Sequence, residues 1–353
     1  ATVWLGLIGG LDDYIKVFRH RKEGLKGRFK IVGQVGLGVI VGTTMWLSPD
    51  IVVREKVTQP VQTVYLNEDG TVLETVQRHV VVSSESLKTT QTTIPFVKNN
   101  EFDYGWLTGG NSVATWILYV LVAIFVVTAV SNGANLTDGL DGLATGVSVP
   151  IVAVLGVLAY LSGHIVYADY LNIMYIPGSG EMVVFAAALV GALVGFLWYN
   201  SFPAQIFMGD TGSLTIGMLL AVMAIRLSMS DPVKESVFPG AIVIAFSFLI
   251  VPMLDVVRVV LHRWRSRKPL FLPDKNHIHH KFIALGMSQR QAMAGIICIA
   301  FTFAVVNVFL IHYLSTTLLF LLDVAVWTML HCYITIKINR KNRLENKLYR
   351  NKI

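Results

Sequence analysis

The dominant feature of the chain is a series of apolar stretches separated by short polar segments. A membrane-spanning helix needs roughly 20 mostly apolar residues. Stretches that approach or meet this length cover residues 31–48, 112–131, 143–162, 182–198, 214–227, 238–257, 292–311 and 316–336. Residues 1–11 form a shorter apolar run, which we expect to be the end of a further span. With about nine spans, the first incomplete, the pattern predicts an all-α polytopic integral membrane protein.

Composition agrees with a membrane protein. The chain is 54% hydrophobic and 14% charged, whereas soluble domains carry about 25% charged residues. The net charge of +7 is explained by topology, so it does not indicate nucleic-acid binding. Both cysteines, Cys298 and Cys332, lie in apolar runs, which argues against a disulfide framework or a zinc site.

One segment, residues 49–111, differs from the rest because it is polar, acidic and rich in Thr and Val. Within it, residues 62–75 alternate around Asp69-Gly70, a dipeptide favoured in tight hairpin turns. We therefore expect a small β-rich insertion on the extracytoplasmic side. It contains no recognisable chemistry.

The basic residues are concentrated in three polar segments. Residues 12–30, 258–290 and 337–353 contain 22 of the 29 Lys and Arg residues. Alternating spans place all three on one side, which the positive-inside rule makes the cytoplasm. This divides the chain into four parts: helices with a basic cytoplasmic loop (1–48), the insertion (49–111), a helix bundle whose cytoplasmic loops are expected to carry the chemistry (112–336) and a basic cytoplasmic tail (337–353).

Polar side chains with possible chemistry also fall on the cytoplasmic side. Asn132, Asn135, Asp138 and Asp141 recur every three residues, so in a helix they would form one polar stripe. Carboxylates at the end of a membrane helix suggest a function. A solvated helix end is the simpler alternative.

Three more polar clusters lie on that side: Asp12-Asp13, the 209–212 segment and the 273–280 loop. Gly209–Gly212 can form a tight turn that opens a helix, and helix starts favour phosphate. Carboxylates, imidazoles and cations together suit a phosphate-containing substrate with Mg²⁺. Zinc is the alternative for the histidines, although no cysteine accompanies them. Topology and attraction to anionic lipids are the alternative for the basic loops.

Three motifs resemble the polyprenyl-phosphate N-acetylhexosamine-1-phosphate transferase superfamily. They occupy residues 10–16 (GLDDYIK), 132–144 and 207–213 (FMGDTGS), and the resemblance covers nearly the whole chain outside the insertion. It implies a helical enzyme of the bacterial cytoplasmic membrane with its active site facing the cytoplasm. Such enzymes use Mg²⁺ to transfer a sugar-1-phosphate from a UDP-sugar to undecaprenyl phosphate, releasing UMP.

The two halves resemble different branches of that superfamily. The front motifs resemble the phospho-N-acetylmuramoyl-pentapeptide transferases, which make lipid I for peptidoglycan. Residues 252–258 and 274–280 are closer to the GlcNAc-1-phosphate transferases that initiate O-antigen or teichoic acid linkage units. Because the front motifs cover more of the site, we expect lipid I synthesis, with UDP-GlcNAc transfer as the alternative.

The resemblance also implies residue roles. Asp210 would bind Mg²⁺, and Asp12 and Asp13 would flank the lipid phosphate, one of them as its base. The expected nucleotide- and substrate-binding residues are Asn132, Asn135, Asp138, Asp141, Asn200, Phe207, His277, His279 and His280. Asp255, near the cytoplasmic end of a span, is expected to orient the histidine loop. The implied partners are undecaprenyl phosphate, the UDP-sugar and membrane lipids, with no nucleic acid; a homodimer is left open.

Other classes of function compete with this prediction. Asp255 and Asp323 lie within predicted spans, which favours a transporter or flippase. Transporters, however, place their sites between repeated halves, and we find no internal repeat. A membrane scaffold that displays the insertion would leave the cytoplasmic motifs unexplained.

Overall fold

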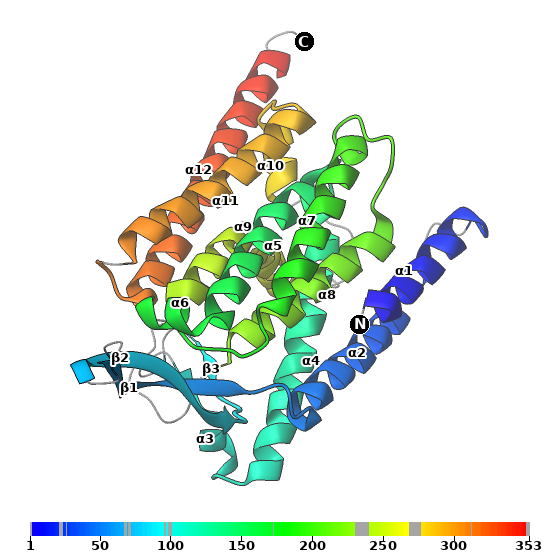
Figure 1. The fold of residues 1–353 in the computed structure, drawn as a ribbon. Coiled ribbons are helices and arrows are strands. Elements are labelled where there is room, and N and C mark those ends of the chain that lie inside the picture. The colour runs from blue at the N-terminus through cyan, green and yellow to red at the C-terminus, as the bar shows by residue number, and fades with distance from the viewer. Residues whose placement is uncertain are drawn as a thin grey trace.

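The computed structural model describes residues 2–20, 24–25, 27–66, 69, 72–94, 97, 101–171, 173–229, 240–267, 277–311 and 313–350 (Figure 1). Its helices are α1 (Thr2–Val17), α2 (Gly27–Leu47), α3 (Gly105–Thr108), α4 (Ser112–Thr137), α5 (Leu143–Gly163), α6 (Ile165–Tyr170), α7 (Glu181–Asn200), α8 (Gly209–Leu227), α9 (Gly240–Arg265), α10 (Ile278–Ala284), α11 (Gln289–Leu310) and α12 (Thr316–Arg350). The strands are β1 (Val53–Leu66), β2 (Val72–Leu87), β3 (Thr92–Thr93) and β4 (Glu101–Phe102).

The helices confirm the predicted fold class. In the described part of the chain, seven are long and apolar enough to cross a membrane: α2, α4, α5, α7, α8, α11 and α12. The 26-residue α9 and the 16-residue α1 coincide with the two other predicted spans. The chain is a multi-pass membrane protein.

Several helices extend beyond their apolar cores. α4 continues six residues past the predicted end at Ser131, and α8 begins at Gly209, ahead of the predicted start at Leu214. α12 has 35 residues, roughly 50 Å at 1.5 Å per residue, which exceeds the ~30 Å hydrocarbon core. The predicted basic tail is therefore largely a continuation of this helix.

Close helix crossings position α4 between α2 and α8. A Cβ on Gly38 of α2 would lie 2.6 Å from the backbone of Ile124, and one on Gly217 of α8 would lie 2.7 Å from that of Ser131. Lipid supplies little hydrophobic drive between helices, so small residues that allow close backbone contact stabilise such crossings. α1 packs against the same helix, α8.

The segment between α2 and α4 contains the predicted hairpin. β1 and β2 pair antiparallel, with Tyr65 opposite Glu74. Of the predicted Asp69-Gly70 turn, Gly70 lies outside the described residues. Backbone hydrogen bonds join this region to the bundle, from Arg54 N to Tyr175 O (3.2 Å) and from Thr93 N to Ser228 O (2.8 Å).

The hairpin and the acidic residues lie at opposite ends of α8. At its C-terminal end, Arg226 donates to the carbonyls of Val52 (3.1 Å) and Pro177 (3.2 Å), beside the hairpin base. At its N-terminal end, Asp210 meets α1 and α2. The 19 residues of α8 span roughly 28 Å, close to the thickness of a bilayer core. Figure 1 shows α10 and the C-terminus at the end opposite the hairpin.

Candidate active site

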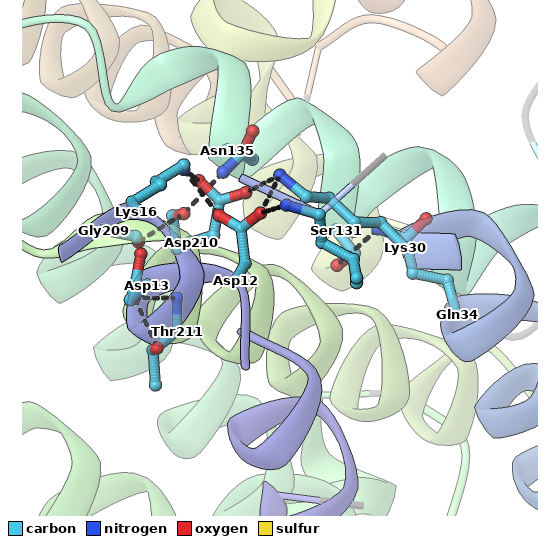
Figure 2. Close-up of polar contacts among 12 residues, drawn as sticks. Asp12, Asp13, Lys16, Lys30, Gln34, Ser131, Asn135, Gly209, Asp210 and Thr211 are labelled. Atoms are coloured by element: carbon cyan, nitrogen blue, oxygen red, sulfur yellow. Dashed lines mark hydrogen bonds and ion pairs between the residues drawn. The ribbon is translucent and has the colours of Figure 1, made fainter. Parts of the chain in front are cut away.

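Three carboxylates from two helices form the centre of the site (Figure 2). Asp12 and Asp13 of α1 and Asp210 of α8 offer oxygens that all lie within 4.8 Å of one another. Among the described residues this is the only group of three or more possible metal ligands. Gly9 permits the arrangement, because a Cβ there would collide with the backbone of Thr211 and push α1 away from the start of α8.

Two lysines lie between the carboxylates. Lys16 Nζ is 2.5 Å from Asp12 Oδ2 and 3.1 Å from Asp210 Oδ1. Lys30 Nζ, from α2, is 3.1 Å from Asp12 Oδ1 and also pairs with Asp210 Oδ2. Neither lysine is among the predicted site residues, because topology explains the charges of that basic segment. Two signals mark Lys16: it ends the 10–16 motif, and its four-residue spacing from Asp12 places both side chains on one helix face.

The third carboxylate, Asp13, contacts the start of α8. Its Oδ2 accepts from the Thr211 backbone N–H (3.1 Å) and hydroxyl (2.5 Å). Gly209 has φ +62°, and a Cβ there would lie 2.8 Å from Asp13 Oδ2. The predicted glycine turn that opens a helix is confirmed, and in this structure an aspartate occupies the anion-favouring helix terminus.

The predicted Asn/Asp stripe is only half formed. Asn132 and Asn135 lie in α4, where Asn135 Nδ2 donates to Ser213 Oγ (2.9 Å) and Asn132 Nδ2 donates to Gln34 Oε1 (2.8 Å). The helix ends at Thr137, so the prediction of one continuous helical face is wrong for Asp138 and Asp141. The two glycines at 139 and 142 favour a turn at this point, and Gly142 has φ +76°.

The turn nevertheless brings Asp138 towards the carboxylate centre. Burial, and next the nearby carboxylates of Asp210, Asp13 and Asp141, together raise the pKa of Asp138 to about 6. Asp141 itself accepts a hydrogen bond from Ala204 N (3.1 Å), which ties the turn to the α7–α8 loop.

Asn200 and Phe207 differ in what they offer a ligand. Asn200 is buried, its Oδ1 accepts from Gly142 N (3.1 Å) and Thr145 Oγ1 (3.0 Å), and its Nδ2 donates to Ile206 O (2.9 Å). Its amide therefore holds the α7–α8 loop against the start of α5. Phe207, in the same loop, is 75% exposed and free to stack on a ligand.

The three histidines form a second cluster at the start of α10. His277 Nδ1 is 2.9 Å from Asp255 Oδ2, and its ring lies parallel to that of His279, 5.6 Å away. His279 rests on the 138–142 turn, since a Cβ on Gly139 would lie 2.7 Å from its Nε2. Burial, and next the electrostatic effect of the neighbouring His280 and His277 rings, lowers the pKa of His279 to about 4. His279 is therefore neutral at pH 7. The rest of the predicted 273–280 loop, up to residue 276, lies outside the described residues.

The donor set fits a hard cation. Carboxylate oxygens are the ligands that Mg²⁺ prefers, whereas structural zinc takes cysteine and histidine. No histidine belongs to the described three-residue group. The ammonium groups of Lys16 and Lys30 complete a mixed-charge cluster that suits a phosphate together with a cation.

Both acidic residues that favoured a transporter have partners. Asp255 binds His277, as above, in agreement with the expected orientation of the histidine loop. Asp323 of α12 accepts from Asn307 Nδ2 of α11 at 2.6 Å and is buried. Each carboxylate therefore takes part in a fixed helix contact.

Comparison with known proteins gives a consistent set of relatives. Residues 1–228 match the family model of glycosyl transferase family 4. A phospho-N-acetylmuramoyl-pentapeptide-transferase of Phocaeicola vulgatus is 58% identical over 286 residues, covering 80% of this chain and 61% of that protein. Those of Parabacteroides distasonis and Flavobacterium psychrophilum are 51% and 47% identical over 272 and 287 residues, covering 76% and 80% of this chain and 60% and 67% of theirs.

The chain thus spans about three fifths of the length of the first two of these relatives. The family match includes all three carboxylates, both lysines and the whole of α8. Together with the helical membrane fold, it establishes that the chain belongs to glycosyl transferase family 4, within the superfamily of polyprenyl-phosphate N-acetylhexosamine-1-phosphate transferases.

Proposed function

We propose that this chain carries the membrane-embedded catalytic part of a phospho-N-acetylmuramoyl-pentapeptide transferase. The reaction is the Mg²⁺-dependent transfer of phospho-MurNAc-pentapeptide from its UDP carrier to undecaprenyl phosphate, giving lipid I and UMP. The observation that carries this proposal is the meeting of Asp12, Asp13 and Asp210 with Lys16 and Lys30. The names of the relatives support it.

The charges of the site suit phosphoryl transfer, which depends on positioning and charge neutralisation more than on covalent chemistry. Lys16 and Lys30 would bind the donor diphosphate, and their present contacts with Asp12 and Asp210 keep both ammonium groups at the centre. Mg²⁺ held by Asp210 would neutralise charge on the diphosphate and stabilise the departing UMP.

The contacts of the two adjacent aspartates favour Asp13 as the base. Asp12 is fully buried, and both of its oxygens pair with lysines. Asp13 uses only Oδ2 towards Thr211 among the described residues. Its second oxygen can accept the proton of the lipid phosphate, while Asp12 holds the two lysines in place.

Around this centre we place the donor between the 138–142 turn and the α7–α8 loop. Phe207 offers an exposed ring for the uracil, and Asp138 offers an acceptor for the nucleoside. His279, neutral and resting on Gly139, would meet the sugar or its phosphate. The 58% identity extends over 286 residues, well beyond the front half of the chain, which favours the muramoyl donor over UDP-GlcNAc.

The decisive assay uses the purified full-length protein with radiolabelled UDP-MurNAc-pentapeptide, undecaprenyl phosphate and Mg²⁺. We expect labelled lipid to form, to depend on Mg²⁺ and to appear with an equal amount of UMP. UDP-GlcNAc is the parallel donor. Faster lipid labelling from UDP-GlcNAc would reassign the donor, and none from either donor would reject the proposed reaction.

We further propose that the protein lies in the bacterial cytoplasmic membrane, with the carboxylates on the cytoplasmic side and the 49–111 insertion opposite. The separation of Asp210 from the hairpin along α8 supports this orientation. In a Cys298→Ala, Cys332→Ala background, Asp69→Cys should react with a membrane-impermeant thiol reagent in spheroplasts, and Ser266→Cys should react only after lysis. The reverse pattern would overturn the orientation.

A further inference from the structure

Asp255, a carboxylate in a membrane helix, accepts hydrogen bonds from three different donors. It is 5% exposed and lies in α9, nearly three turns before the helix ends at Arg265. Oδ1 accepts from Arg258 Nη2 at 3.0 Å, and Oδ2 accepts from His277 Nδ1 at 2.9 Å. The backbone N–H of Ile278 contacts both oxygens, at 3.2 and 3.3 Å.

If Asp255 served only its own helix, its contact with Arg258, three residues later in α9, would be sufficient. The other two donors belong instead to the start of α10, across a sequence gap of more than 20 residues. Asp255 therefore fixes where α10 begins. It also fixes one histidine tautomer: because Nδ1 of His277 faces the carboxylate, Nε2 is the nitrogen left for other contacts.

Because Asp255 fixes the start of α10, it also sets the position of His279, which lies on the side of the site where we place the donor. The rings of His277 and His279 are parallel to within 2°. His279 is 3% exposed, its Nε2 has no hydrogen-bond partner among the described residues, and it lies directly against Gly139. Gly139 belongs to the same turn as Asp138 and Asp141. A shift of the α10 start would therefore move His279 off that turn.

We propose that Asp255 is a positioning residue that seats the histidines of α10 on the 138–142 turn, so that His279 Nε2 is presented to the sugar-phosphate part of the donor. This inference rests on the proposed function. Three donors converge on the Asp255 carboxylate, and an amide in its place would offer a single acceptor oxygen and two N–H groups that repel them.

The first test needs no catalysis. Full-length protein in detergent is treated with diethylpyrocarbonate, and modification of His277 and His279 is followed by mass spectrometry. In the wild type both should react slowly because they are buried. Asp255→Asn should speed the modification of His279 about tenfold or more, since it weakens hydrogen bonds to a charged group. The control, Asp323→Asn, alters another buried carboxylate bound to Asn307 and should leave the rate unchanged.

The second test asks whether Asp255 acts through His279. Asp255→Asn should lower kcat/KM for the UDP-sugar by about 10- to 100-fold, as for other supporting contacts, without changing KM for the lipid phosphate. In a His279→Ala background the same substitution should have almost no further effect. The proposal is wrong if diethylpyrocarbonate modifies His279 no faster in Asp255→Asn than in the wild type. It is also wrong if Asp255→Asn lowers kcat/KM by its full factor in the His279→Ala background. A wild type that forms no lipid would reject the proposed function, while the modification rates would still decide the seating of α10.

Discussion

The two ends of α8 both bury charged side chains within a membrane protein, yet they are built differently. At the N-terminal end, Asp210 shares two lysines with Asp12, and Asp13 joins the group from α1. At the C-terminal end, Arg226 is 8% exposed and donates to the Val52 and Pro177 carbonyls and to the Met229 sulfur.

The difference lies in whether the partners can change. Backbone carbonyls are fixed by the fold, so Arg226 acts as a permanent link between α8, the hairpin base and the α6–α7 segment. Lysine and aspartate side chains can exchange one ion pair for another, so a phosphate can replace a carboxylate beside a lysine and a cation can replace a lysine beside a carboxylate. Buried charge with fixed neutral partners indicates structure. Buried charge with several mobile partners of both signs indicates a binding site.

The strongest test of this comparison removes charge from the mobile end. Asp210→Asn keeps the shape but loses the negative charge that would hold Mg²⁺, so transfer should fall by about 10³-fold or more. Radiolabelled lipid formation measures the loss, and added Mg²⁺ should restore it only in part. Asp323→Asn serves as the control, with near-normal transfer expected. Near-normal transfer by Asp210→Asn would remove that residue from the site.

Removing a lysine should have the next largest effect. Lys30→Gln loses an ammonium group that contacts both Asp12 and Asp210, and a charge-assisted hydrogen bond of this kind corresponds to about 10- to 100-fold in affinity. We expect kcat/KM for the UDP-sugar to fall by that factor, mainly through KM. Lys30→Arg should recover part of the loss. An unchanged KM would mean that Lys30 only supports the fold.

The protonation of Asp138 should give a smaller, pH-dependent effect. Its pKa is raised to about 6, so the carboxylate is mostly charged at pH 7 and becomes neutral as the pH falls through 6. If the charged form binds donor, kcat/KM should decline below pH 6, with roughly a tenfold loss for each pH unit. Asp138→Asn should lower the plateau and abolish this limb of the pH profile. A limb that persists in the variant would assign the titration to another group.

The fixed end should be the least important for chemistry. Arg226→Gln leaves the Val52 and Pro177 carbonyls short of buried donors, which should lower the free energy of unfolding by about 1–3 kcal/mol. Denaturation by SDS, followed by circular dichroism, measures this change. Transfer per folded molecule should equal that of the wild type. A specific loss of turnover with unchanged stability would contradict the structural role assigned to Arg226.

Much of the architecture could be predicted from the sequence because the bilayer imposes a simple rule. Long apolar runs become helices, and the described spanning helices coincide with the predicted ones to within a few residues at most boundaries. The β-hairpin followed from alternation around Asp69. The resemblance to the transferase superfamily also predicts Asp12, Asp13 and Asp210 as site residues, and the structure brings these three carboxylates together.

Only the tertiary structure decided how these residues meet. Lys16 and Lys30 looked like topological charges until α1, α2 and α8 packed together around Asp12 and Asp210. The stripe through Asp138 broke at a glycine turn, because local backbone geometry overrode the three-residue period. The sequence predicts that Asp255 orients the histidine loop, but only the structure shows that its partners there are the His277 ring and the Ile278 N–H. The sequence pattern indicates which side chains need partners. Contacts between helices that are distant in the chain determine what those partners are, and local periodicity does not encode such contacts.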